Sequence, residues 1–270
     1  MYRLARTPFV LALALVAVTA AWASSLWACS PPGANKPTGT LRVLERDRAE
    51  GGRARCLIAF LPGIGDEPEA YLEHGFVDRL HAANVDADVR LVDAHFGYYR
   101  EQSVVPRLVE DVLEPAETAG YDQLWLVGIS LGGLGSLALS SAEPVRVDGL
   151  ILLAPYLGDV DQVATVEGAG WPEQVDVPAE EPFDRIWRWL ATRDTEATPL
   201  VLAYGEADRF RDGHRLASRA VPPSDVLVGA GGHRWPVWEE LWGAIVDSGR
   251  LQRACSAPTE REPEEQTGDE

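Results

Sequence analysis

Short, continuously apolar segments alternate with segments of helical spacing along most of the chain. Residues 54–61, 121–129 and 147–155 are apolar almost throughout, as expected for strands buried on both faces. Residues 67–83 instead carry apolar side chains at helical spacing. This alternation predicts an α/β fold with a mostly parallel sheet and helices on both faces. The expected strands are 41–45 (at an edge), 54–61, 87–93, 121–129, 147–155, 200–204 and 226–229, and the expected helices are 67–83, 104–119, 131–141 and 236–246.

One long segment interrupts this alternation. Residues 157–198 lack a strand pattern, are rich in acids and prolines and contain one amphipathic stretch, 183–191. A long insertion after a central strand favours a lid or cap over a site, with an acidic surface loop as the alternative. Trp171, Trp187 and Trp189 offer an apolar wall for a substrate, although aromatic residues at helical spacing more often serve packing.

The composition limits the class of protein. A chain of 270 residues suits one α/β domain, and 46% hydrophobic and 24% charged residues are ordinary for a globular protein. The formal net charge of -18 argues against nucleic acid as a partner, because its phosphates would be repelled. Part of that charge lies in the tail 256–270, which is rich in Glu and Pro and is expected to be disordered.

The N-terminus has the parts of an export signal. Arg3 and Arg6 precede an uncharged run, 9–28, and Leu26-Trp27-Ala28-Cys29 resembles a bacterial lipobox, apart from the bulky Trp27. We expect residues 1–28 to be a signal peptide and Cys29 to be lipidated. A plain secretory signal and an uncleaved membrane anchor are the alternatives, since the run is just long enough to span a bilayer.

This N-terminus predicts an exported protein held at the membrane of the cell envelope by its lipid or by a signal anchor. Residues 29–40, rich in Pro, Gly and Thr, are expected to be a linker, and residues 41–255 the main domain.

Three cysteines, Cys29, Cys56 and Cys255, predict neither a disulfide framework nor a metal site, because none lies at ligand spacing from another or from a histidine. If Cys29 carries lipid, Cys56 and Cys255 remain to form a bridge in an oxidising compartment. We favour the simpler interpretation that Cys56 is a small buried residue.

The segment Gly128-Ile129-Ser130-Leu131-Gly132 lies between a predicted buried strand and a predicted helix. A strand that enters a helix with almost no loop forces the residue between them into a strained conformation and exposes its side chain. Glycines two positions before and after it remove Cβ atoms that would collide. This G-x-S-x-G pattern, a nucleophile elbow, predicts Ser130 as a nucleophile.

A serine needs a base at neutral pH, and the base needs an acid to hold its tautomer. Asp208 follows the strand 200–204, and His233 follows the last strand in a glycine-rich loop. We therefore predict Asp208 as the acid, with Glu206 as the alternative, and His233 as the base. Of the other histidines, three lie on predicted helices, where we expect surface roles, and one follows a strand and is a candidate to line the pocket; these are His74, His81 and His214, and His95.

The transition state also needs donors for its oxyanion. The backbone N–H of Leu131, at a helix N-terminus, is the first candidate. The second is the N–H of Ile64, in the loop Leu61-Pro62-Gly63-Ile64-Gly65 after the first core strand.

Four motifs in this order make residues 41–249 similar to the serine hydrolases of the α/β-hydrolase superfamily: F-L-P-G-I-G around Pro62, G-I-S-L-G-G around Ser130, Y-G-E-A-D ending at Asp208, and G-G-H ending at His233. Pro62 replaces a histidine that is frequent in the family. The resemblance implies an α/β-hydrolase fold and acyl transfer through a covalent acyl-enzyme. It implies a small-molecule ester or acyl substrate and neither a metal nor an organic cofactor.

Within this superfamily the fold does not determine the chemistry. We expect a carboxylic-ester hydrolase. The alternatives are a thioesterase, an acyltransferase or a peptidase on the same fold, and a non-catalytic binding protein.

Overall fold

The computed structural model describes residues 39–47, 52–142, 146–173 and 181–256. The expected signal peptide, Cys29, most of the expected linker and almost all of the expected tail lie outside these residues. Among the described residues, no helix has the length and apolar character needed to cross a membrane.

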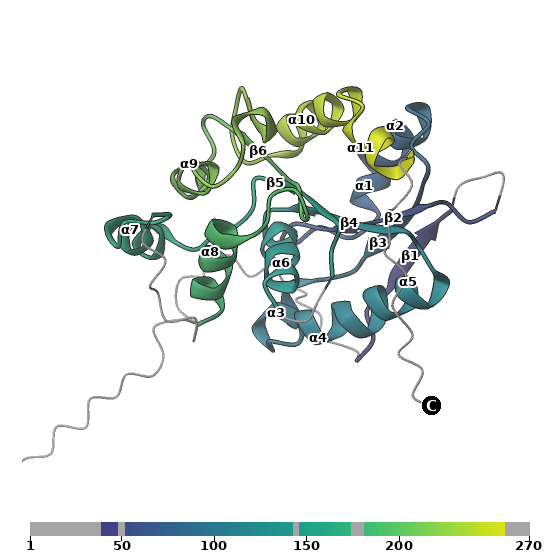
Figure 1. Ribbon diagram of the computed structural model, residues 1–270, viewed down its shortest axis with the longest axis horizontal. Coiled ribbons are helices and arrows are strands. Elements are labelled where there is room, and N and C mark those ends of the chain that lie inside the picture. The colour runs from purple at the N-terminus through teal and green to yellow at the C-terminus, as the bar shows by residue number, and fades with distance from the viewer. Residues whose placement is uncertain (1–38, 48–51, 143–145, 174–180, 257–270) are drawn as a thin grey trace, which may run out of the picture. The chain divides into compact units, whose positions relative to one another are not determined.

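A seven-stranded sheet with the strand order β1-β3-β2-β4-β5-β6-β7 forms the centre of the described domain (Figure 1). The strand β1 pairs antiparallel with β3 at the edge, and every other neighbouring pair is parallel. The expected edge strand and mostly parallel sheet are thus both observed. The strands are β1 (Val43–Arg46), β2 (Cys56–Leu61), β3 (Ala87–Val92), β4 (Gln123–Ile129), β5 (Gly149–Leu153), β6 (Leu200–Gly205) and β7 (Val226–Gly229).

The central strands are apolar because helices cover both of their faces. Every residue of β2, β5 and β6 is buried, as is every residue of β4 after Gln123. The register pairs Leu61 with Gly128 and Ile129 with Leu153, so these strands end at the same edge of the sheet. Loops at this edge are where open parallel sheets place their ligands.

Helices cover the two faces of the sheet in separate groups (Figure 1). The Trp-rich helix α10 packs with α2 and α11 on one face, and α6 packs on β4 and β2 on the other. The bounds are α1 (Ala70–Glu73), α2 (Phe76–Ala82), α3 (Phe96–Arg100), α4 (Val104–Leu108), α5 (Glu114–Ala119), α6 (Leu131–Ser140), α7 (Val160–Gly168), α8 (Pro182–Thr192), α9 (Arg211–Ser218), α10 (Trp235–Asp247) and α11 (Arg250–Ser256).

Two expected helices are interrupted in the structure. The segment 67–83 divides into α1 and α2 at Gly75, whose φ is 70°. The segment 104–119 divides into α4 and α5 around a π-helical turn, Val109–Leu113. Apolar spacing predicts which face of such a segment is buried, and it does not register a local change of backbone geometry.

The insertion between β5 and β6 is more helical than its sequence indicated. Besides α8, it contains α7, which begins with a capping box in which Asp159 and Gln162 bond reciprocally. The rings of Trp171 and Trp187 meet edge to face at 4.9 Å, and both side chains are buried. The indole Nε1 of Trp171 donates to the Trp187 carbonyl oxygen at 2.8 Å. These two tryptophans therefore pack the insertion's own interior.

A disulfide joins Cys56 at the start of β2 to Cys255 in α11, with their Cα atoms 5.4 Å apart. The interpretation of Cys56 as an unpaired buried residue is wrong. The two cysteines are 199 residues apart in the sequence, and they meet because α10 and α11 fold back over the sheet. Nothing in the sequence around either cysteine indicates this arrangement. The bridge links the first core strand to the last helix.

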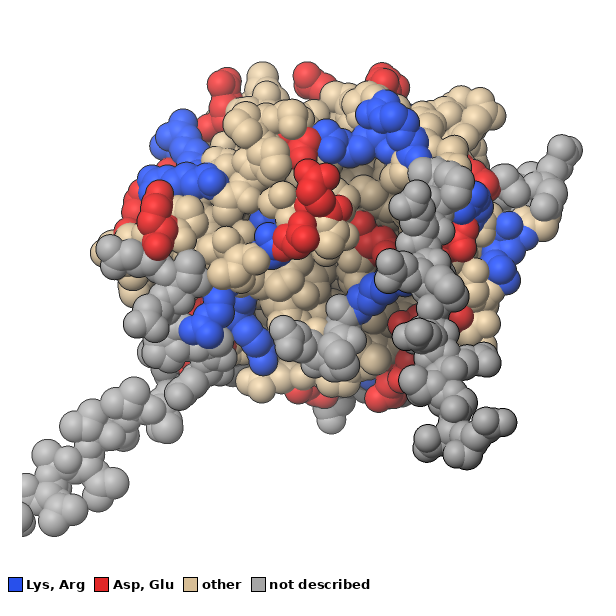
Figure 2. Space-filling view, in the orientation of Figure 1, with Lys and Arg blue, Asp and Glu red and all other residues tan. Residues whose placement is uncertain are grey.

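On the face shown in Figure 2, acidic and basic side chains are interspersed. This face has no broad basic surface of the kind that nucleic acid requires.

We predict that the double variant Cys56→Ser/Cys255→Ser unfolds with a free energy about 2–5 kcal/mol below that of the oxidised protein, because the bridge restricts the unfolded chain. Urea unfolding followed by tryptophan fluorescence measures the difference. Reduced wild-type protein is the control and should unfold like the double variant. Equal urea midpoints for the oxidised wild type and the double variant would contradict the prediction.

Candidate active site

Ser130 lies on the turn where β4 enters α6. Its φ of 51° and ψ of -110° are rare for a residue with a side chain. A Cβ atom on Gly132 would overlap the carbonyl oxygen of Leu61, and one on Gly128 would overlap the backbone of Gly132. Both glycines are therefore required by close packing of α6 on the sheet. The predicted elbow geometry is present.

The structure brings Ser130, His233 and Asp208 into one hydrogen-bonded chain. Ser130 Oγ lies 2.8 Å from His233 Nε2, and His233 Nδ1 lies 2.8 Å from Asp208 Oδ2. The Asp208 side chain is fully buried and that of His233 is 9% exposed. Residues that are far apart in the sequence thus meet with the spacing that proton transfer requires.

Asp208 is held in its ionised form by its neighbours. Burial alone raises the pKa of Asp208, but the hydrogen bonds from His233 and from the Phe210 N–H outweigh burial and leave the pKa below its ordinary value. The Phe210 N–H donates to Oδ1 at 2.8 Å. An ionised Asp208 accepts from Nδ1–H of His233, which leaves Nε2 free to accept the Ser130 proton.

Glu206, the alternative acid, is exposed to solvent. Its backbone N–H donates to the Gly229 carbonyl oxygen at 2.9 Å, which ties the turn after β6 to the end of β7. The carboxylate that contacts the imidazole is that of Asp208.

Aromatic rings hold the imidazole of His233 from two sides. Phe210 and Trp238 each meet it edge to face, with centroid distances of 5.1 and 5.0 Å. Tyr156 contacts Phe210 at 5.2 Å and Phe183 at 6.0 Å, so the insertion reaches the site through an aromatic chain. No sequence pattern marks Phe210, Tyr156 or Phe183 as site residues, because only the fold brings them close to His233.

The two candidate oxyanion donors lie on segments that adjoin Ser130. Leu131 is the first residue of α6, and Ile64 is half-buried in the loop after β2. A Cβ atom on Gly63 would lie 3.7 Å from Ser130 Cβ, which places this loop against the serine. The oxyanion roles of the Leu131 and Ile64 N–H groups remain predictions.

His214 is completely buried, so the expected surface role for this residue is wrong. Its Nε2 lies 2.9 Å from the Pro155 carbonyl oxygen, and its Nδ1 is buried without a hydrogen-bond partner. The next residue, Tyr156, donates its N–H to the Ser130 carbonyl oxygen at 2.9 Å. His214 therefore holds the turn that holds the strained Ser130 backbone.

The buried position of His214 has an electrostatic consequence. Burial is the main cause that lowers its pKa to about 4, although Asp208 and the bond to Pro155 act in the opposite direction. The imidazole is therefore neutral at neutral pH, with its proton on the Nε2 that faces the carbonyl.

The remaining histidines are placed by other contacts. His74 stacks on Trp235 with ring centroids 4.0 Å apart and lies 2.5 Å from a Glu239 carboxylate oxygen, and its side chain is 30% exposed. His81 is exposed on α2, as expected. His95 caps α3 by accepting the Gly97 N–H, and the structure records no contact between it and the site.

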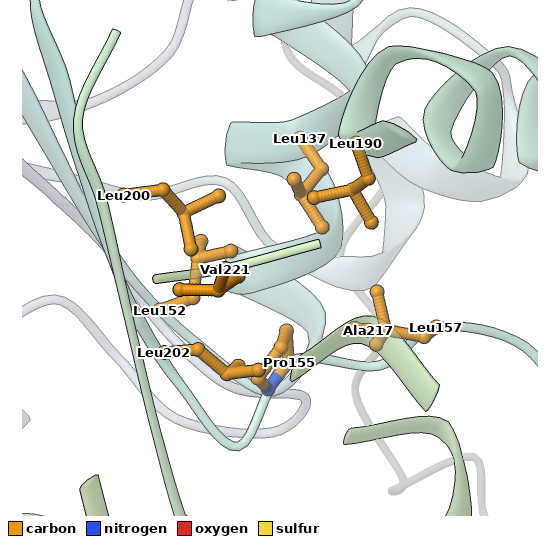
Figure 3. A pocket seen from close by; sticks show the side chains of 9 residues that line it. All are labelled: Leu137, Leu152, Pro155, Leu157, Leu190, Leu200, Leu202, Ala217 and Val221. Carbon is orange, nitrogen blue, oxygen red and sulfur yellow. The ribbon is translucent and has the colours of Figure 1, made fainter. Parts of the chain in front are cut away.

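An apolar pocket lies beside the site and contains none of its polar residues (Figure 3). Pro155 and Leu157, on either side of Tyr156, belong to its wall, and the other lining residues come mainly from strands β5 and β6 and from helices α6, α8 and α9. We interpret this pocket as a packing seam between the sheet and the insertion. Among the described residues, no group of three or more His, Cys, Asp or Glu side chains could hold a metal ion.

No protein-family model and no curated protein sequence matches this chain. Solved structures do match it. Est1E from Butyrivibrio proteoclasticus superposes with a TM-score of 0.54 at 13% identity, over 79% of this chain and 94% of that one. The S-formylglutathione hydrolase FrmB from Staphylococcus aureus gives 0.51 at 11% identity, over 79% and 98%. FphF, described as a fluorophosphonate-binding serine hydrolase from Staphylococcus aureus, gives 0.50 at 11% identity, over 78% and 98%.

Together with the sheet order, these similarities show that the chain has the α/β-hydrolase fold, which confirms the fold class expected from the sequence.

We predict that His214 makes stability depend on pH. Its folded pKa of about 4 lies below the ordinary value of 6.5, so the unfolded chain takes up the proton first as the pH falls. Stability is therefore full above pH 6.5 and falls by about 3 kcal/mol towards pH 4 through this residue.

Urea unfolding at pH 7 and pH 4.5 tests this prediction. His214→Gln keeps a donor for Pro155 and does not titrate, so it should lose less stability between the two pH values than the wild type. His81→Gln, on the exposed face of α2, is the matched control and should behave like the wild type. If His214→Gln and the wild type lose equal stability, the prediction fails.

Proposed function

We propose that this protein is a serine hydrolase that cleaves carboxylic esters through an acyl-enzyme. The observation that carries the proposal is the hydrogen-bonded chain from Ser130 through His233 to Asp208. Ser130 lies on the strained turn at the N-terminus of α6. A serine, a base and an acid in this arrangement form a triad suited to acyl transfer.

The mechanism follows from the geometry of the triad. Ser130 Oγ attacks the ester carbonyl carbon while His233 Nε2 accepts its proton, and the carbonyl oxygen becomes an oxyanion. The N–H groups of Leu131 and Ile64 are proposed to donate to this oxyanion. The imidazolium, stabilised by Asp208, then protonates the leaving alcohol as the C–O bond breaks. Water, deprotonated by the same imidazole, attacks the acyl-enzyme, and the carboxylic acid and free Ser130 are released.

The structural neighbours support this proposal at the level of the reaction. FrmB is named as an S-formylglutathione hydrolase, and FphF is named as a fluorophosphonate-binding serine hydrolase. At 11% identity, neither neighbour indicates which substrate this chain takes. A thioesterase, an acyltransferase and a peptidase would use the same triad, and substrate comparison separates them from an esterase.

We further propose that the protein is exported and tethered through a lipid on Cys29. The charged start, the apolar run and the lipobox-like Leu26-Trp27-Ala28-Cys29 carry this proposal. The disulfide between Cys56 and Cys255 supports it, because such bridges persist mainly in oxidising compartments.

The triad proposal predicts that a fluorophosphonate probe modifies Ser130 in the folded protein and leaves Ser130→Ala unmodified. Asp208→Asn should lower the kcat for a p-nitrophenyl ester by about 10³–10⁴-fold, because the imidazole loses its preferred tautomer. Glu206→Gln removes the same formal charge from the same turn and should retain activity. Modification at a residue other than Ser130, or equal losses in the two acid variants, would count against the proposal.

The tethering proposal predicts that, after expression in a bacterial host, the wild type is found in the membrane fraction. Cys29→Ser should instead enter the aqueous phase of a detergent partition. Mass spectrometry of the N-terminal peptide should find diacylglyceryl on Cys29 of the wild type. Unchanged partition of Cys29→Ser, with no lipid on the wild type, would refute it.

A further inference from the structure

Asp66 brings a carboxylate next to the proposed nucleophile. Its backbone N–H donates to the Gly63 carbonyl oxygen at 3.3 Å, so the loop after β2 turns back towards the end of the strand. A Cβ atom on Gly63 would lie 3.0 Å from Asp66 Oδ2 and 3.7 Å from Ser130 Cβ. The carboxylate and the serine therefore flank the same glycine of the proposed oxyanion loop.

No fixed cation neutralises this carboxylate within the described part of the chain. Its Oδ1 accepts a long hydrogen bond, 3.4 Å from Trp235 Nε1, and no ion pair with Lys or Arg is found for the Asp66 carboxylate among the described residues. Arg209, next to the triad acid in the sequence, stacks 4.7 Å above the Phe210 ring. The titratable groups that interact with Asp66 are His74, His233 and the buried Tyr71.

Asp66 is half-buried, which makes its charge more effective than one in open solvent. Burial raises the pKa of Asp66 above its ordinary value, and the hydrogen bond from Trp235 and the two histidines only partly offset this effect. A negative charge this close to the developing oxyanion opposes its formation. A cationic group on the substrate would remove that penalty and would bind to the carboxylate.

We propose that Asp66 is a specificity-determining residue that selects substrates with a cationic group, such as an ammonium, close to the scissile carbonyl. The inference rests on the proposed function, because it concerns the same site. Because Asp66 lies close to Ser130, the cation must also lie close to the scissile carbonyl of the substrate. Only a cation carried a few bonds from that carbonyl reaches the Asp66 carboxylate. Anionic substrates are disfavoured for the same reason.

A pair of phosphonate probes tests this without a known substrate. Both probes are p-nitrophenyl methylphosphonates that modify a serine with release of p-nitrophenolate. The cationic probe carries a 2-(trimethylammonio)ethyl group, and the neutral probe carries a 3,3-dimethylbutyl group of the same shape. The ratio of their second-order rates on the full-length protein measures cation preference, and the neutral probe reports the intact triad. Mass spectrometry identifies the modified residue.

We expect the cationic probe to react at least about tenfold faster with the wild type, as for a hydrogen-bonding or ionic contact to a charged group. Asp66→Asn should bring the ratio close to one, because the cationic probe loses its ionic partner and the neutral probe no longer meets an opposing charge. Asp66→Glu should keep part of the preference. Glu67→Gln, an exposed acid on the same loop, removes the same charge and should keep the full ratio.

The outcomes separate the two proposals. Equal rates in the wild type, or a ratio that survives in Asp66→Asn, overturn the role of Asp66 and leave the serine hydrolase in place. If neither probe modifies Ser130, the proposed function fails, and the role of Asp66 fails with it.

Discussion

The close approach of α6 to the ends of β2 and β4 is the constraint on which the site depends. With no loop between β4 and α6, Ser130 must adopt a positive φ, and only glycine fits at Gly128 and Gly132. The strained turn is retained because its backbone is bonded on both sides: Ser130 N–H donates to Leu153, and its carbonyl accepts from Tyr156. The cost of this conformation is thus met by packing and hydrogen bonds from neighbouring segments.

Helix α9 holds one of these neighbouring segments, the turn after β5, in place. His214 binds the Pro155 carbonyl from α9, and its neutral imidazole avoids a second buried charge close to Asp208. The same helix begins just after the loop that carries Asp208 and Phe210. A rearrangement of α9 would therefore disturb both Asp208 and Ser130, although no residue of this helix has a role in the proposed reaction.

Two carboxylates influence the electrostatics of the site: Asp208, which is buried, and Asp66, which is half-buried. Asp208 is stabilised as an anion by hydrogen bonds that outweigh its burial, and it orients His233. The pKa of Asp66 is shifted in the opposite direction, because burial dominates and no fixed cation is found beside it among the described residues. Two carboxylates near one imidazole thus have different environments, and different environments assign them different roles.

The amino-acid sequence by itself determined the parallel sheet and the elbow, and it supplied Asp208 and His233 as candidates. These features depend on local patterns: continuous apolar runs, glycine spacing, and polar residues directly after strands. Most strand bounds came within two residues of those observed. The breaks in two helices were not predictable, because apolar spacing does not record local backbone geometry.

Only the tertiary structure decided the pairing of Cys56 with Cys255, the burial of His214, the contact of His233 with Asp208 and the position of Asp66 beside Ser130. Each of these depends on the approach of segments that are distant in the chain or on the direction in which a turn points. The physical reason is that local propensity sets which elements form, whereas burial, partners and electric field at a side chain arise only when those elements pack together.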